Sequence, residues 1–208
     1  MNKIDKLTGK HAGKPADYAR AYLDYLASCF ERIDSDAIAA FICLLLDARE
    51  TGNAVYFIGN GGSAATASHF ANDLSIGTRT GDDKPFRAIS LTDNVAVMTA
   101  LANDEGYDAM FVDQLRVHFR DGDSLVAISA SGNSPNVIAA VEYAKARGAT
   151  IVGLTGFDGG RLRPLSDISL HVATEKGEYG PVEDMHMIFD HLIGSYLIAG
   201  VRRERTAD

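Results

Sequence analysis

The chain is poor in cysteine and has no long apolar run, and each absence excludes a class of protein. Cysteine occurs twice in 208 residues, at Cys29 and Cys43, and both positions fall inside apolar helical patterns. We expect both thiols to be buried and to act as small apolar side chains. No stretch approaches the roughly 18 to 20 apolar residues that cross a bilayer, and residues 1–6 lack the apolar core of a secretion signal. We therefore expect a cytoplasmic protein without a membrane partner.

The sequence also lacks a cluster of basic residues. It has 20 Lys and Arg against 28 Asp and Glu, which gives a formal net charge of −8, and the basic residues are scattered along the chain. This distribution argues against a nucleic-acid-binding surface. Apolar residues make up 46% of the chain and charged residues 23%, which is typical of a globular protein. At this length the chain fits one ordinary domain with a substantial core.

Short β-rich runs alternate with helical patterns from residue 53 onward. Apolar strands that alternate with helices are typical of a parallel sheet covered on both faces. The sequence therefore predicts an α/β protein, a doubly wound α/β/α sandwich with five parallel strands. The expected strands are Ala54–Ile58, Arg87–Leu91, Ser124–Ser129, Thr150–Thr155 and Ile168–Val172, and the expected helices are Ala64–Ser75, Val95–Ala102, Ala109–Phe119, Pro135–Ala146 and Val182–Val201.

Two further helices are expected before the sheet. Apolar residues recur at helical spacing from Pro15 to Ile33, and Ser35 is a credible N-cap for a second helix. This pair is too apolar to stand alone, so we expect it to pack on the domain or on a second subunit. Residues 1–14 are polar and are expected to form a flexible or lightly docked tail, which leaves residues 15–208 as a single domain.

Two loops rich in glycine and serine carry the main functional signal. Residues 59–63, Gly-Asn-Gly-Gly-Ser, follow the first strand and open a helix, where glycines let backbone amides approach an anion. Residues 129–134, Ser-Ala-Ser-Gly-Asn-Ser, again lie between a strand and a helix and offer hydroxyl and amide donors without a charged side chain. In the common strand order 2-1-3-4-5 these loops follow neighbouring strands, at the crevice where ligands bind. The sequence therefore predicts a site for a phosphorylated sugar between them.

Two helices offer residues for proton transfer or metal binding. His69 and Asp73 are four residues apart on a predicted helix and point the same way, which suits a shared divalent metal or a base with an orienting partner. The last helix offers Glu183, His186, Asp190 and His191. Glu183 and His191 are separated by roughly 12 Å of helical rise, so one zinc ion reaches both only if the helix is irregular. For His186 we favour a packed histidine or a subunit contact.

These motifs together resemble the sugar isomerase (SIS) family, and in particular the bacterial phosphoheptose isomerases, over roughly residues 20 to 200. The resemblance implies a flavodoxin-like fold and a homotetramer with sites near the subunit interfaces. It implies aldose–ketose isomerisation of sedoheptulose 7-phosphate and D-glycero-D-manno-heptose 7-phosphate, for heptose, lipopolysaccharide or related glycan precursors. The motifs that carry it are residues 59–63, 67–71, 102–104, 129–134, 154–156, 158–160 and 183–186, with His191.

The resemblance also assigns roles to individual residues. It implies Asp73 as the catalytic base and His191 as the acid, with zinc as the cofactor. The implied zinc ligands are His69, Asp73, Glu183 and His191. The implied substrate contacts are Asn60, Gly61, Gly62, Ser63, Asn103, Asp104, Ser129, Ala130, Ser131, Ser134 and Glu183.

Three positions depart from the family pattern, and they leave the substrate open. The family's glutamate is Asp73 here, its glutamine is Glu183, and its substrate-facing arginine is replaced by Gly77. One alternative is a non-catalytic branch of the family, a tetrameric adaptor for the bacterial replication initiator, which residues 92–95 also resemble. Retention of both histidines and both carboxylates favours the enzyme. Another isomerase of sugar phosphates, or a regulator that senses them, is the third interpretation.

Overall fold

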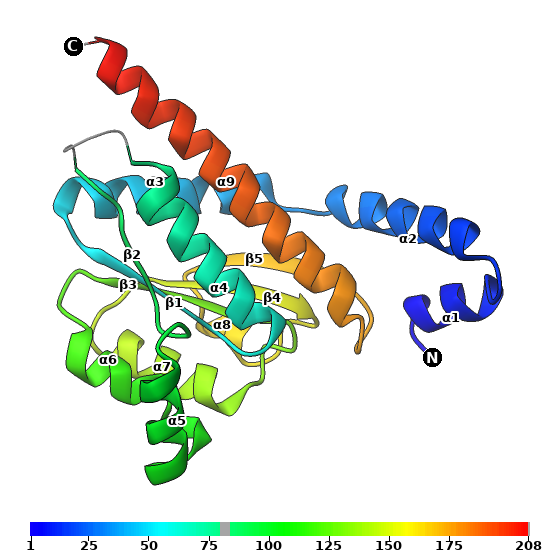
Figure 1. Cartoon of the computed structure of the whole chain (residues 1–208), viewed down its shortest axis with the longest axis horizontal. Coiled ribbons are helices and arrows are strands. Elements are labelled where there is room, and N and C mark those ends of the chain that lie inside the picture. Colours follow the sequence, from blue (N-terminus) through cyan, green and yellow to red (C-terminus); the bar gives the residue numbers. More distant parts are fainter. Residues whose placement is uncertain (80–83, 208) are drawn as a thin grey trace.

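A computed structural model describes residues 1–79 and 84–207 of the chain, with side chains up to residue 201. Its centre is a five-stranded sheet, parallel throughout, in the order β2-β1-β3-β4-β5 (Figure 1). This confirms the predicted fold class and strand order. The strands are β1 (Ala54–Gly59), β2 (Arg87–Ser90), β3 (Ser124–Ser129), β4 (Ile151–Phe157) and β5 (Ile168–Ala173).

Helices cover both faces of the sheet, and each face has its own core. Successive strand residues point to opposite faces, so Phe57 joins the core on one side while its neighbours Tyr56 and Ile58 join the core on the other. The first face carries α3 (Ser35–Thr51), α4 (Gly62–Asn72), a π-helical turn (Asp73–Gly77) and α9 (Tyr179–Ala207); the second carries α5 (Val95–Asp104), a 3-10 turn (Tyr107–Ala109), α6 (Val112–His118), α7 (Pro135–Ala146) and α8 (Leu162–Leu165).

The N-terminal helices differ in part from expectation. Residues 1–14, expected as a flexible tail, contain helix α1 (Lys3–Lys10), which begins with a capping box at Asn2. Helix α2 (Pro15–Phe30) extends away from the sheet in Figure 1 and leaves Leu23 63% exposed. The predicted N-cap of α3 is wrong by one residue, because the carboxylate of Asp34 accepts the two backbone N–H groups that a cap must satisfy.

The two cysteines do not share one environment. Cys29 is buried in the core, as predicted, but Cys43 on α3 is exposed, so the prediction for that thiol is wrong. The apolar residues of α3 extend around more of the helix than the part that packs on the sheet, and Cys43 lies outside that part. Within residues 1–79 and 84–207 we find no helix whose length and hydropathy would let it span a bilayer.

A buried carboxylate joins the N-terminal helices to the start of α9. Glu178 is 1% exposed, and one of its oxygens accepts the backbone N–H groups of Lys3 and Ile4 at 2.8 and 3.2 Å. The other accepts the Tyr25 hydroxyl at 2.5 Å and the Glu175 backbone N–H at 3.0 Å. Helices α1 and α2 are thus anchored at the residue that precedes α9.

We predict that Glu178→Ala lowers the free energy of unfolding by about 3 kcal/mol, because it leaves the Tyr25 hydroxyl without its buried partner. Glu175→Ala removes an exposed carboxylate three residues away and should change stability by less than about 0.5 kcal/mol. Urea denaturation monitored by circular dichroism measures both. Equal effects of the two substitutions would contradict the anchoring role.

Candidate active site

The two glycine- and serine-rich loops lie side by side at the carboxyl edge of the sheet. Strand β1 pairs with β3 so that Gly59 lies opposite Ile128, and the loops begin just beyond these residues. A cavity of about 150 Å³ opens between them. The predicted neighbouring positions of the two loops are therefore confirmed by the strand order. The cavity is lined by Asn60, Ser63, Ile128, Ser129, Ala130, Ser131, Ser134, Tyr179 and Glu183.

A reciprocal pair of amides fixes the distance between the loops. The side chains of Asn60 and Asn136 exchange two hydrogen bonds of 2.9 Å each, and Asn136 is 1% exposed. The hydroxyl of Tyr107 donates to the same Asn60 oxygen at 2.9 Å. Sequence reasoning missed Asn136 and Tyr107, because neither belongs to a motif and only the fold brings them to Asn60.

The serine-rich loop presents neutral donors to the cavity. The Ser129 and Ser134 hydroxyls lie 3.2 Å apart, and the Ser131 hydroxyl accepts the Asn133 backbone N–H at 3.3 Å. The loop ends at Ser134, the N-cap of α7, where the positive end of the helix dipole favours an anion. Within the part of the chain that the structure describes, the residues lining the cavity include no Lys or Arg. A phosphate here would be held by hydroxyls and backbone amides.

Glycine at position 62 makes room for a carboxylate. A methyl group built on Gly62 would overlap the side-chain carboxylate of Glu183, which reaches across from the first turns of α9. The preceding Gly61 has a φ of 55°, a conformation that favours glycine. Burial, and next the charge of Asp184, raise the pKa of Glu183 above its ordinary value. Glu183 therefore faces the start of α4 as a carboxylate whose pKa is raised.

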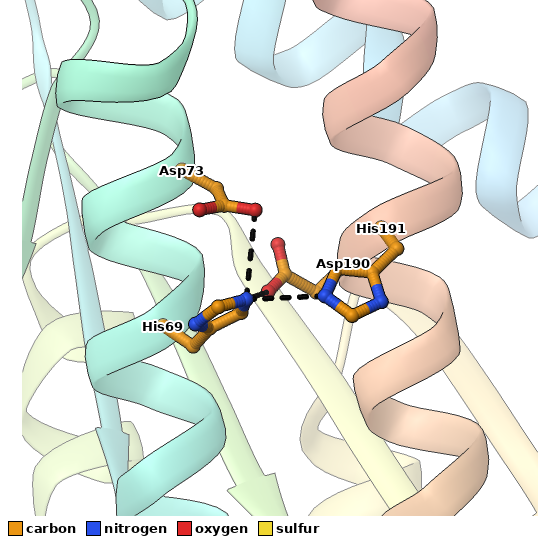
Figure 2. Close-up of side chains that lie close together, drawn as sticks. All are labelled: His69, Asp73, Asp190 and His191. Atoms are coloured by element: carbon orange, nitrogen blue, oxygen red, sulfur yellow. Dashed lines mark hydrogen bonds and ion pairs between the residues drawn. The ribbon is translucent and has the colours of Figure 1, made fainter.

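A cluster of two histidines and two aspartates lies farther along the same two helices, α4 and α9. Figure 2 shows His69 and Asp73 pointing from α4 and the π-turn toward Asp190 and His191 on α9. The Nε2 atoms of the two histidines are 3.1 Å apart, and His69 Nε2 lies 3.6 Å from an Asp73 oxygen and 3.7 Å from an Asp190 oxygen. One ligand atom from each of the four residues lies within 4.8 Å of the others, a spacing that can hold a metal ion.

Asp190 is the member of this cluster that the sequence-based assignment left out. Its side chain is fully buried, and both oxygens have no hydrogen-bond partner among the described residues. Burial, and next the charge of Asp73, raise the pKa of Asp190 to about 7, against the lowering effect of His191. A signal was available: Asp190 lies on the buried stripe of α9 with Phe189 and Ile193, where an acidic residue is out of place.

The structure divides the predicted site residues into three groups. His69, Asp73 and His191 come together in the cluster, while most of the predicted substrate contacts lie at the loop cavity. Glu183 lies at the cavity and is not a member of the cluster among the described residues.

Asn103 and Asp104 are exposed at the end of α5, hydrogen-bonded to each other at 2.7 Å and outside the cavity lining. His186 is fully buried near the Thr155 carbonyl, as expected of a packed histidine.

Comparison with known proteins agrees with this geometry. Residues 17–156 match the model of the SIS domain family. The phosphoheptose isomerase of Rhodospirillum rubrum is 37% identical over 179 residues, which cover 85% of this chain and 94% of the relative.

Two solved structures are similar in fold and in length. Phosphoheptose isomerase GmhA from Neisseria gonorrhoeae superposes with a TM-score of 0.78 at 29% identity, over 89% of this chain and all of the other. A phosphoheptose isomerase from Francisella tularensis gives 0.76 at 25% identity, over 96% and 100%.

A doubly wound sheet with a serine-rich loop between β3 and α7 is the arrangement of a domain that binds sugar phosphates. The chain belongs to the SIS domain family and, within it, to the phosphoheptose isomerases.

We predict that Ser131→Ala combined with Ser134→Ala leaves the melting temperature nearly unchanged, because both hydroxyls are partly exposed at the cavity. The same variant should lose the rise in melting temperature that a bound sugar phosphate gives the wild type. Thermal melting with and without sedoheptulose 7-phosphate measures both effects. A double variant that does not fold would mean that the loop is structural.

Proposed function

We propose that the protein interconverts sedoheptulose 7-phosphate and D-glycero-D-manno-heptose 7-phosphate. It is an isomerase of phosphorylated sugars, as its relatives named phosphoheptose isomerases are. The reaction moves a proton between two adjacent carbons through an enediol. It needs a base above the carbon and a group that stabilises the developing oxyanion.

The observation that carries the proposal is the spacing between the cavity and the cluster. Gly62 at the cavity and His69 in the cluster are seven residues apart on α4, which corresponds to roughly 10 Å of helical rise. Glu183 and Asp190 show the same spacing on α9. A seven-carbon chain can span such a distance, with its phosphate in the serine-rich loop and its reacting carbons at the cluster.

Asp73 and His191 are the groups that we assign to proton transfer. Both are accessible to solvent, unlike Asp190. A carboxylate has two oxygens, so Asp73 can take up the proton on one while the other faces His69 at 3.6 Å. His191 keeps its second ring nitrogen free of the contact with His69, and that nitrogen can return a proton to the substrate oxygen.

We propose zinc as the cofactor, because two imidazoles and carboxylate oxygens suit that ion. The fit rests on Asp190, whose two buried oxygens have no partner among the described residues and would be satisfied by a cation. A bound zinc ion would supply Lewis-acid stabilisation of the developing oxyanion.

Replacement of Asp73 tests the catalytic assignment. We predict that Asp73→Asn lowers kcat on sedoheptulose 7-phosphate by at least about 100-fold with a modest change in KM, because the base is lost and the shape is kept. Asp73→Glu restores the length that the family resemblance implies and should retain or raise activity. A coupled assay over C5 to C7 ketose phosphates measures both. Failure of the wild type on every one of these substrates, with and without zinc, would contradict the proposed function and favour the adaptor.

We also propose that the protein is a homotetramer. Helix α5 is mostly apolar, yet it buries none of its residues in one subunit and leaves Val95 68% exposed. Asn103 and Asp104, implied as substrate contacts, lie at the end of this helix and outside the cavity of their own subunit. Packing of α5 against another copy would cover the apolar surface of the helix. It would also bring Asn103 and Asp104 to the site of the neighbouring subunit.

Light scattering at micromolar concentration should therefore give four times the subunit mass of 22.3 kDa. Val95→Asp places a charge on the exposed apolar surface of α5 and should reduce the mass, whereas Val117→Asp changes an exposed valine on α6 and serves as the control. A wild-type monomer would contradict the proposal.

A further inference from the structure

We infer that Asp190, and not Glu183, is the fourth metal ligand of this protein, and that Glu183 belongs to the substrate cavity. The inference rests on the proposed function for the identity of the sugar but not for the metal. It changes the ligand set that the family resemblance implies, and it follows from where the two carboxylates lie.

The position of Glu183 separates it from the metal cluster. Its carboxylate occupies the space that a side chain at Gly62 would need, and it lines the cavity with Ser63 and Ser129. Gly62 precedes His69 by seven residues on α4, so roughly 10 Å of helix lie between them. Metal–oxygen bonds are only about 2 Å long. Glu183 is accordingly not among the four described residues whose ligand atoms lie within 4.8 Å of one another.

We assign the role of fourth metal ligand to Asp190, which directly precedes His191 in the chain. One of its oxygens lies 3.7 Å from His69 Nε2, close to the 3.6 Å between that nitrogen and Asp73. Two ligand atoms bound tetrahedrally to one zinc ion lie about 3.3 Å apart. The 3.1 Å between the two imidazole nitrogens agrees with this value. The four donors, two imidazole nitrogens and two carboxylate oxygens, lie within 4.8 Å of one another, and a zinc ion held by them could take a substrate oxygen as a fifth ligand.

The buried state of Asp190 is the independent observation. A hydrogen bond between His69 and His191 would account for their contact, but it would leave both buried Asp190 oxygens without a hydrogen-bond partner among the described residues. A buried carboxylate in that condition is costly unless a cation or a donor meets it. A divalent cation between the two helices satisfies Asp190 and both imidazoles at once.

Zinc binding to the full-length protein, purified without a His-tag and stripped with a chelator, tests the inference. Competition with a chromophoric chelator measures the affinity for Zn²⁺ without any assay of activity. Asp190→Asn should weaken binding by more than about 100-fold, the upper end for loss of a residue that only supports a ligand. Glu183→Ala, which removes every possible ligand atom at this position, should leave zinc affinity unchanged and reduce the stabilisation by sedoheptulose 7-phosphate. His191→Ala is the positive control, and Asp24→Asn, on an exposed part of α2, is the negative one.

The melting temperature of the metal-free variants separates a ligand from a structural residue. Asp190→Asn and Asp190→Ala should melt no lower than the stripped wild type, because each removes a buried carboxylate without a partner, and only their rise on addition of Zn²⁺ should be lost. The inference is overturned if Glu183→Ala weakens zinc binding as Asp190→Asn does, if Asp190→Asn binds normally, or if the wild type takes up no zinc. If the zinc pattern holds while the wild type shows no isomerase activity, the ligand assignment stands and the proposed function falls.

Discussion

The reciprocal hydrogen bonds between Asn60 and Asn136 are the interaction on which the rest of the site depends. Parallel pairing of β1 with β3 brings the two loops to neighbouring positions, about 4.8 Å apart along the sheet. The amide pair then fixes one loop against the other, with both side chains donating and accepting. Helix α4 begins at Gly62, two residues after Asn60, so its direction, and with it the place of His69, follows from the loop. The carboxylate of Glu183, from the first turns of α9, packs on that same glycine.

In the cluster between α4 and α9, an acidic residue suited to bind a ligand occupies a position where an apolar residue would make the fold more stable. Asp190 occupies a core position that an apolar residue would fill without cost, between Phe189 and Ile193 on the buried stripe of α9. Burial, and next the charge of Asp73, raise the pKa of Asp190, so the charged form of this carboxylate is disfavoured at its position. Such a position is typical of functional sites, where a local rule of packing is broken for the sake of a ligand.

The sequence was sufficient for the order of the strands and for both loops, because hydrophobic periodicity and glycine–serine motifs are local signals. The strand Ser124–Ser129 and the helix Pro135–Ala146 were predicted with their observed limits. The contacts between the loops were not predictable, since Asn136 and Tyr107 reach Asn60 through tertiary packing alone. The fourth residue of the cluster was missed for a related reason. Asp190 belongs to no motif, and a helix pattern does not reveal which neighbouring helix an acidic residue faces.

The parallel course of α4 and α9 bears on the choice of substrate. Seven residues separate Gly62 from His69 on α4 and Glu183 from Asp190 on α9, so in the proposed function whole turns of helix, and not flexible loops, lie between the place for the phosphate and the place for proton transfer. A helix cannot shorten to meet a smaller sugar. A five-carbon sugar phosphate held by the serine-rich loop would leave its reacting carbons short of Asp73, whereas a seven-carbon chain extends farther along the helices. Binding of the phosphate and the distance from the phosphate to the base are then separate requirements. The distance is the one that selects for the length of the sugar chain.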